Sequence, residues 1–449
     1  MLKKIIPFFL MMVTLCVIFP ITQASAISYD IDFETQTKAL ELVNLDTDTV
    51  VYTKNADQKM YPASTTKIMT YIITVESIKD LEGTTLTVKK SVLDDLLGTG
   101  SSLAVVYEGE ELTVLQLLNL MMVPSGNDAA SVLCDYVGNG SEEAFVEKMN
   151  QKAQELGCTN THFANAHGLH DPDHYTTADD MAKIAKYAMT LPYFTEITSQ
   201  VSYTLPPTNK CKEERTVVTT NRMLMNGDPD HYYQYAQGIK TGHTDEAGYC
   251  LVSSAIYDGS SYLCVALGAP TTDSEGNAVS VRQDMVDSAN LYRWAFTKLQ
   301  LKSIAEKGNP VAEIPLKYVW GKDTILLSPE ENFTAVLPSD VNPSSLLVDT
   351  DIPESVSAPL HAGDIIGTAT YSYAGQVLGT VNVVVTEDVS RNEVLHVMDI
   401  VWSVVSSPIF LICAALVIIL IIVYIVIAVQ YNKKKKEMRK SKKYKTPKH

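Results

Sequence analysis

The sequence lacks the spacings by which cysteine and histidine side chains usually hold a metal ion. Its seven cysteines include no Cys-x-x-Cys pair, and no His-Glu-x-x-His segment is present. One cysteine lies in each of two long apolar runs near the ends of the chain, so an odd number remains and at least one thiol is unpaired. We expect no metal and no other cofactor. We assign no disulfide among the remaining cysteines, which are Cys134, Cys158, Cys211, Cys250 and Cys264.

One loop rich in histidine and aspartate has the residue types of a metal site. Its candidate ligands are His167, His170, Asp171, Asp173 and His174. Because the helical His-Glu-x-x-His pattern is missing, we favour a loop held by hydrogen bonds over a metal centre.

Positive charge is scarce in the body of the chain. The formal net charge of the 449 residues is −16, although residues 1–26 carry +2 and residues 404–449 carry +9, which leaves −27 for residues 27–403. Nucleic-acid binding depends on neutralising phosphates with lysine and arginine, so this balance argues against a nucleic-acid partner. It suits a soluble region outside the membrane. Nothing in the sequence specifies an oligomeric state.

The N-terminus has the pattern of a secretory signal. Lys3-Lys4 precede an apolar run over residues 5–21, and Ala24-Ser25-Ala26 is a small-x-small cleavage site. This predicts a signal peptide over residues 1–26, with an uncleaved anchor helix as the alternative.

The C-terminus has the pattern of a membrane anchor. Residues 404–430 are long and apolar enough to span a bilayer, and four lysines follow from Lys433. Because basic residues stay in the cytoplasm, we expect a single-pass protein of the cell membrane with an extracytoplasmic body and a basic tail over residues 431–449.

The remaining patterns predict an α+β fold, with an antiparallel sheet flanked by helices, over residues 27–300. Strands are expected first, then helices, then strands and a closing helix. The expected strands lie at 39–44, 49–52, 238–244, 248–255 and 262–267, and the expected helices at 67–78, 113–122, 128–136, 141–156, 178–190 and 279–299. Residues 301–390 alternate Val, Thr, Pro and Gly and predict a small β-sandwich. Residues 391–403 form either an ordinary linker or an amphipathic helix on the membrane.

Ser64 and Lys67 stand three residues apart at the predicted start of a helix, just after Pro62. Residues at i and i+3 share a helix face, so the hydroxyl and the amine can meet. A desolvated lysine can take the proton of a serine and make it nucleophilic. A capping serine followed by a solvated lysine gives the same pattern, so the pair needs partners elsewhere in the chain.

Two later clusters supply such partners. Ser64-x-x-Lys67, Ser125-Gly126-Asn127 and Lys240-Thr241-Gly242, in this order and separation, resemble the active-site set of the penicillin-binding protein and serine β-lactamase superfamily. Flanking stretches are similar to the D-alanyl-D-alanine carboxypeptidase branch, the low-molecular-weight penicillin-binding proteins. These stretches are 62–70, 124–129, 163–169, 175–182 and 240–244. The resemblance covers residues 30–300 and, more loosely, the β-region and the C-terminal anchor. It implies a β-lactamase/transpeptidase-like catalytic domain.

The resemblance also implies an activity and catalytic roles. Ser64 would attack the terminal peptide bond of a peptidoglycan stem pentapeptide and form an acyl-enzyme, and β-lactams would acylate the same serine. Lys67 would accept the serine proton, since a second cation nearby lowers its pKa. Ser125 would pass a proton to the departing D-alanine.

Further residues are implied to bind the substrate. Asn127 would hold Lys67 and the substrate backbone, while Lys240 and Thr241 would bind the terminal carboxylate. Gly242 would keep the strand edge open for the substrate, and the backbone N–H of His243 would complete an oxyanion hole with that of Ser64.

Three alternatives remain open from the sequence. A D,D-endopeptidase would use the same site on cross-links. A class A β-lactamase is disfavoured because Gly126 stands where an aspartate is usual and no Glu-x-x-Leu-Asn segment is evident. A non-catalytic wall-binding scaffold is disfavoured because the polar residues of all three clusters are intact.

The segment 205–237 is longer and more polar than the resemblance leads us to expect. Its Arg222 is expected to form a structural salt bridge, with substrate contact as the alternative.

Overall fold

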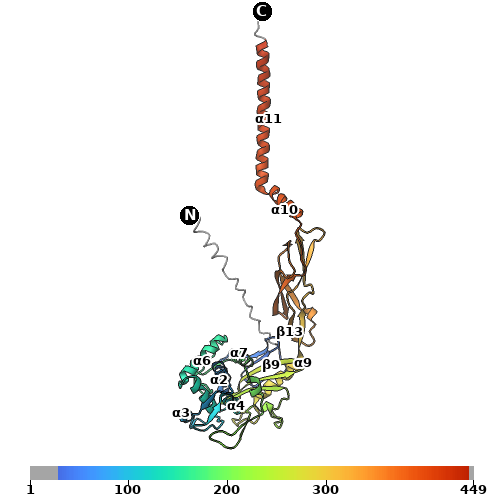
Figure 1. Cartoon of the computed structure of the whole chain (residues 1–449). Helices are drawn as coiled ribbons and strands as arrows, with labels where there is room; N and C mark the ends of the chain where they lie inside the picture. The colour runs from blue at the N-terminus through green and yellow to red at the C-terminus, as the bar shows by residue number, and fades with distance from the viewer. Residues whose placement is uncertain (1–28, 444–449) are drawn as a thin grey trace, which may run out of the picture. The chain divides into compact units, whose positions relative to one another are not determined.

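The computed structural model describes residues 29–443, so the signal-peptide prediction lies outside the described residues. The chain forms two compact units (Figure 1). The first comprises the chain up to Ile304 together with Phe333–Leu347 and Tyr371–Gly379, and the second comprises the remainder. The boundary predicted at residue 300 stays a prediction.

A five-stranded antiparallel sheet is the centre of the first unit, in the order β2-β1-β9-β8-β7. Its strands are β1 (Ala39–Asn44), β2 (Thr49–Lys54), β7 (Ala236–Thr244), β8 (Gly248–Tyr257) and β9 (Ser260–Ala269). All five expected strands are present, β1 with β2 and β8 with β9 form hairpins, and the turn between β8 and β9 falls at Asp258-Gly259. Strand β7 is an edge strand, so one side of it is free to border a cleft.

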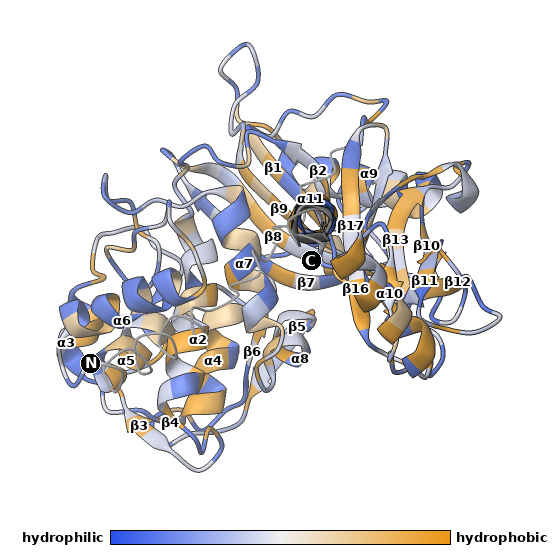
Figure 2. Ribbon diagram, turned by 90° about the horizontal axis from the view of Figure 1, so that it is seen from above, coloured by the Kyte–Doolittle hydropathy of each residue, from blue (hydrophilic) through white to orange (hydrophobic). Residues whose placement is uncertain are grey.

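Helices cover both faces of this sheet. Ala39 and Val43 of β1 join the core that contains α2 (Lys67–Ser77) and α7 (Ala178–Ala188), whereas Leu40 and Leu42 join the core that contains α9 (Gln283–Lys298). The alternation follows from the period of two in a strand. Orange stretches on α2 and α4 in Figure 2 mark apolar residues that are buried in the first of these cores, the one that contains α2 and α7.

Three further helices pack around α2. They are α4 (Val114–Met122), α5 (Asn127–Val137) and α6 (Glu142–Glu155). Thr113 and Gln116 form a capping box at the start of α4. The sequence patterns located these helices to within two residues. They missed the shorter elements, which have too few residues to show a period: β3 (Thr85–Thr87), α3 (Lys90–Asp94), β4 (Glu111–Thr113), α8 (Phe194–Thr198), β5 (Ser202–Leu205) and β6 (Arg215–Val218).

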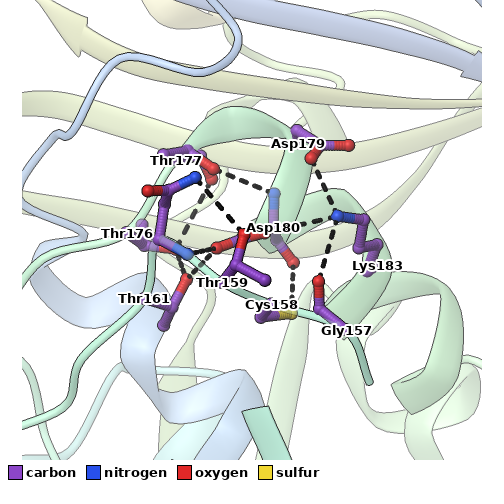
Figure 3. A network of polar contacts seen from close by, with 10 residues as sticks. Gly157, Cys158, Thr159, Thr161, Thr176, Thr177, Asp179, Asp180 and Lys183 are labelled. Carbon is purple, nitrogen blue, oxygen red and sulfur yellow. Dashed lines mark hydrogen bonds and ion pairs between the residues drawn. The ribbon is translucent and has the colours of Figure 1, made fainter. Parts of the chain in front are cut away.

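A polar network fixes the start of α7 (Figure 3). The Thr177 hydroxyl accepts the backbone N–H of Asp180 and so caps the helix. The Asp180 carboxylate accepts the N–H of Asn160 and the hydroxyl of Thr161. The network thereby ties the start of the loop over residues 159–175 to a helix of the core.

The C-terminal region is all-β, as predicted. A six-stranded sheet has the order β14-β16-β17-β12-β11-β15, and β10 pairs with β13 in a two-stranded sheet. The strands are β10 (Leu299–Ala305), β11 (Ala312–Lys317), β12 (Thr324–Pro329), β13 (Phe333–Pro338), β14 (Leu347–Asp351), β15 (Val356–Ser357), β16 (Ile365–Tyr373) and β17 (Gln376–Val385).

Two helices end the described chain. Helix α10 (Glu393–Val405) takes up most of the predicted linker, and α11 (Pro408–Lys443) contains the apolar run. The run was expected to begin at residue 404, but α11 begins at Pro408, because proline cannot continue the preceding helix. Within residues 29–443, α11 is the one helix long and apolar enough to cross a membrane.

Candidate active site

Ser64 lies in a single 3-10 turn, Ala63–Thr66, immediately before α2. The Thr65 hydroxyl donates to Pro62 O and the Thr66 hydroxyl donates to Ala63 O, both at 2.7 Å, so the turn is closed by its own side chains. Ala63 has a φ of 47°, a conformation that costs an alanine free energy. The structure therefore sets Ser64 at the entrance of the helix in a tightly held turn, as the sequence predicted.

The Lys67 amine contacts Ser64 and two carbonyl oxygens. Its Nζ lies 2.9 Å from Ser64 Oγ, 2.6 Å from Asn127 Oδ1 and 2.8 Å from His167 O. The two carbonyl oxygens can only accept hydrogen bonds. A neutral amine has two N–H groups and one lone pair, so these acceptors direct the lone pair toward the Ser64 hydroxyl.

The surroundings of Lys67 favour that neutral amine. The side chain is completely buried, and this burial, with the nearby charge of Lys240, lowers the pKa of Lys67 well below its ordinary value, against a smaller opposing effect of Asp128. The geometry and the lowered pKa together make Lys67 a candidate base for Ser64.

The second cluster lies between α4 and α5. Ser125 has a φ of 67° and borders the same cleft as Ser64, while Asn127 begins α5. The buried Asp128 carboxylate accepts the backbone N–H groups of Ala104 and Val106. Asp128 thus anchors the chain just after the loop Thr99–Ser102, and this loop forms part of the rim of the cleft.

The third cluster lies on β7, next to the Ser64 turn. A methyl group on Gly242 would lie 2.9 Å from Pro62 O and 3.1 Å from Ser64 N. Glycine is therefore needed at this position, because β7 approaches the turn that contains Ser64 (Ala63–Thr66) closely. This closeness also sets the Ser64 N–H beside β7, as an oxyanion hole shared with His243 requires.

Lys240 and Thr241 face different surroundings. The Thr241 hydroxyl borders the cleft and lies 2.5 Å from the Thr220 hydroxyl. Lys240 is only 1% exposed, and its Nζ donates to Thr241 O. Burial and the charge of Arg282 lower the pKa of Lys240 to about 7. The Lys240 amine therefore lies behind the cleft wall.

The three clusters meet at one cleft with a volume of about 610 Å³. Six of the catalytic and substrate-binding residues expected from the sequence border it, namely Ser64, Ser125, Asn127, Thr241, Gly242 and His243, and so does His170 of the histidine-rich loop. The amines of Lys67 and Lys240 lie behind them. The sequence patterns did not indicate the loop Thr99–Ser102, Glu246 or Arg282, which also border the cleft.

Arg282 is the cleft residue of greatest chemical interest that the sequence reasoning missed. Its guanidinium donates to the Asp284 carboxylate and to Cys250 O, and lies 4.4 Å from the centre of the Tyr249 ring. It stands forty residues beyond Gly242 and outside every short motif, so no local pattern indicates it.

Two histidines of the histidine-rich loop form hydrogen bonds beside the turn that contains Ser64 (Ala63–Thr66). His174 Nδ1 accepts the backbone N–H of Ala164, and its Nε2 lies 2.7 Å from the Thr66 hydroxyl. His167 contributes its backbone oxygen to Lys67, and burial beside that amine lowers the His167 pKa to about 3. The two histidines therefore hold the turn and the amine in place.

Arg222 forms an ion pair with Asp228, which supports the structural interpretation of this arginine. It is not among the residues that border the cleft within the described part of the chain.

Comparison with known proteins gives matches along most of the chain. Residues 23–271 match the family of D-alanyl-D-alanine carboxypeptidases, and residues 299–391 match the C-terminal domain of penicillin-binding protein 5. The D-alanyl-D-alanine carboxypeptidase DacF of Bacillus subtilis is 31% identical over 358 residues, which are 79% of this chain and 86% of that protein. The D-alanyl-D-alanine carboxypeptidase DacC of Escherichia coli is 30% identical over 75% of this chain and 80% of its own length.

Solved structures agree with these matches. Penicillin-binding protein 5 from Haemophilus influenzae is 27% identical, with a TM-score of 0.63 over 81% of this chain and all of that one. The DD-transpeptidase of Streptomyces K15 is 31% identical, with a TM-score of 0.52 over 60% of this chain and all of that one.

Proposed function

The chain belongs to the D-alanyl-D-alanine carboxypeptidase family of serine hydrolases, and we propose that it removes the terminal D-alanine of peptidoglycan stem pentapeptides through an acyl-enzyme on Ser64. The family acts on peptidoglycan peptides and binds β-lactams. The observation that carries the proposed role of Ser64 is its 2.9 Å contact with the buried amine of Lys67.

In the proposed reaction, neutral Lys67 takes the Ser64 proton as Oγ attacks the carbonyl carbon of the penultimate D-alanine. The negative charge that develops on the carbonyl oxygen is stabilised by the backbone N–H groups of Ser64 and His243. The C–N bond then breaks, and the proton held by Lys67 reaches the departing amine through the Ser125 hydroxyl. Water then attacks the ester carbonyl and gives a proton to Lys67, and Lys67 passes that proton to Ser64 Oγ as the ester bond breaks, which frees the Ser64 hydroxyl and leaves Lys67 neutral again.

The terminal carboxylate of the substrate is the feature that this site is proposed to recognise. Thr241 borders the cleft with a hydroxyl, Lys240 contributes positive charge from behind the wall, and Arg282 brings a guanidinium to the cleft itself. A guanidinium matches a carboxylate with two parallel N–H groups. We therefore add Arg282 to the carboxylate-binding residues proposed from the sequence.

The alternatives differ in substrate rather than in chemistry. A D,D-endopeptidase and a β-lactamase would both acylate Ser64, whereas a wall-binding scaffold would have no use for a buried lysine beside a serine. Burial of an amine lowers the stability of the fold, and a scaffold would have no reason to retain a residue with this cost. This favours an enzyme, and the family favours the carboxypeptidase.

We propose a location in the cell membrane with the catalytic unit outside. Helix α11 has the length and apolar composition of a single span, and Lys433–Lys436 follow its apolar part. The proposed organisation is a signal peptide (1–26), a catalytic domain (27–300), a β-domain (301–390), a juxtamembrane segment (391–403), a span (404–430, within which α11 begins at Pro408) and a basic tail (431–449). A chain truncated after residue 403 should leave the membrane fraction, and continued membrane association would contradict the anchor.

Labelling with a fluorescent penicillin tests the catalytic assignment. The wild-type protein should be labelled, Ser64→Ala should not, and Ser274→Ala, in an exposed loop, should be labelled like the wild type. Release of free D-alanine from a pentapeptide, with no cleavage of cross-linked dimers, separates the carboxypeptidase from the endopeptidase. An unlabelled wild-type protein would exclude acylation of Ser64.

A further inference from the structure

A buried aspartate–histidine pair lies in the polar segment that the family motifs do not account for. Within residues 205–237, the His231 side chain is completely buried and that of Asp228 is 8% exposed. His231 Nδ1 lies 2.9 Å from Asp228 Oδ1. No step of the proposed reaction uses either residue, so their burial needs another explanation.

The partners of His231 fix its hydrogens. Its Nε2 accepts the backbone N–H of Arg282 at 2.9 Å, so that nitrogen carries no proton. Nδ1 faces a carboxylate and therefore carries the proton and donates it. His231 thus connects Asp228 to the backbone of the arginine that borders the cleft.

Asp228 is itself firmly held. It forms an ion pair with Arg222 and accepts the backbone N–H groups of Asp230 and His231 on Oδ1. Burial alone would raise the pKa of Asp228, but the hydrogen bonds from His231 and Arg222 outweigh it and lower the pKa below the ordinary value. The carboxylate stays charged and keeps the imidazole in one orientation.

Arg282 needs an anchor at its backbone. It is the N-cap of α9 and has extended φ and ψ, so its N–H has no partner within the helix. Its guanidinium is steered by Asp284 and by the Tyr249 ring, and its side chain is 14% exposed. A shift of the backbone at this residue would move the guanidinium in the cleft, because the helix begins only at the next residue.

We propose that His231, oriented by Asp228, is a positioning residue that fixes the guanidinium of Arg282 for the carboxylate of the substrate. This inference rests on the proposed function, since it concerns the carboxylate end of the D-alanyl-D-alanine substrate. It also assigns a function to the polar segment 205–237, which contains Asp228 and His231. A merely structural role would stabilise the segment without changing the preference for a carboxylate.

Two substitutions separate the two hydrogen bonds of His231. His231→Gln sets an acceptor near the position of Nε2, so the bond from Arg282 N–H can persist. His231→Asn sets a donor near the position of Nδ1, so the bond to Asp228 can persist while that from Arg282 is lost. The two variants have side chains of similar polarity, so their comparison tests which of the two hydrogen bonds affects binding of the carboxylate.

The experiment measures binding by the full chain in detergent, in the Ser64→Ala background, so that turnover plays no part. The probes are N-acyl-D-alanyl-D-alanine and its C-terminal amide, and the readout is the ratio of their dissociation constants. We expect His231→Asn to reduce the preference for the acid about tenfold, as loss of one buried hydrogen bond would, and His231→Gln to retain it within about twofold. With Arg282→Ala also present, His231→Asn should have no further effect on the ratio.

Other results would overturn the inference. Equal weakening of acid and amide by His231→Asn, or an effect that persists with Arg282→Ala, would show that His231 only supports the fold. An unchanged ratio in a variant with an unchanged melting temperature would show that the contact does nothing for binding. Failure of the proposed function would appear differently, as a wild-type chain that releases no D-alanine, and the comparison of acid with amide would still report on Arg282.

Discussion

The amine of Lys67 lies 2.9 Å from the hydroxyl of Ser64, and its other two partners are carbonyl oxygens that can only accept hydrogen bonds. The ammonium form would use all three of its N–H groups on acceptors and could not take the serine proton. The neutral form satisfies both carbonyls and still offers a lone pair to Ser64. In the reaction proposed above, catalysis therefore depends on the protonation state of one buried amine, and the first two predictions follow from that proposal.

Lys67→Arg should abolish acylation. The guanidinium keeps the positive charge but does not lose its proton in proteins, so the base is absent at every working pH. We expect a loss of about 10³-fold or more in the rate of labelling by a fluorescent penicillin. The control is Lys90→Arg on the exposed face of α3, which should react like the wild type. Labelling of Lys67→Arg at an undiminished rate would assign the base to another residue.

Asn127→Asp should move the pH dependence of acylation toward alkaline pH. In the proposed reaction neutral Lys67 is the reactive form, so the rate should rise with pH as the amine loses its proton. A carboxylate in place of the amide 2.6 Å from Nζ stabilises the ammonium and raises the pKa of Lys67. The rising limb of the rate should shift by about one pH unit or more relative to the wild type. A shift toward acid pH, or none, would mean that Lys67 is not the group that titrates.

Gly242→Ala should slow acylation. The added methyl group would lie too close to Pro62 O and Ser64 N, so the turn that contains Ser64 must move by about a few tenths of an ångström. Because misplacement of reacting atoms is costly, we expect a decrease of about 10- to 100-fold in the acylation rate. The matched control is Gly227→Ala, where no heavy atom lies within 4 Å of the added methyl group. Equal rates in the two variants would contradict the close packing of β7 on the turn.

The sequence predicted those parts of the site that short motifs carry. The contact of Ser64 with Lys67 was predictable because a turn of helix fixes the spacing of residues i and i+3. The layered fold was predictable because the strands of its sheet are apolar and short turns join β1 to β2 and β8 to β9. These features depend on neighbours along the chain.

Features that depend on distant segments were not predictable in the same way. Arg282 reaches the cleft only because α9 begins beside β8, and the His231 ring accepts a hydrogen bond from its backbone across fifty intervening residues of chain. The burial of Lys240 depends on which elements pack over β7. Sequence periodicity reports the faces of single elements and does not specify which elements lie against each other.

Glu41 is a further product of tertiary packing, and it yields a prediction about stability. It lies in β1 on the same face as Ala39 and Val43 and is only 3% exposed. Burial, with a further contribution from Asp179, raises its pKa from 4.5 to about 8, against smaller opposing effects of Lys186 and Lys183. The folded chain therefore holds a proton here that the unfolded chain releases near pH 4.5.

Glu41→Gln should remove this pH dependence. Between about pH 4.5 and pH 8 the folded state binds one more proton than the unfolded state, so the free energy of unfolding of the wild type falls as pH rises, by at most about 1.4 kcal/mol per pH unit from this group. Glutamine stays neutral in both states. The melting temperatures of wild type and Glu41→Gln should agree below pH 4.5 and diverge above it, with the variant more stable at pH 8. Glu111→Gln, an exposed carboxylate in β4, is the control. Parallel curves for wild type and Glu41→Gln across this range would show that Glu41 is ionised in the folded protein.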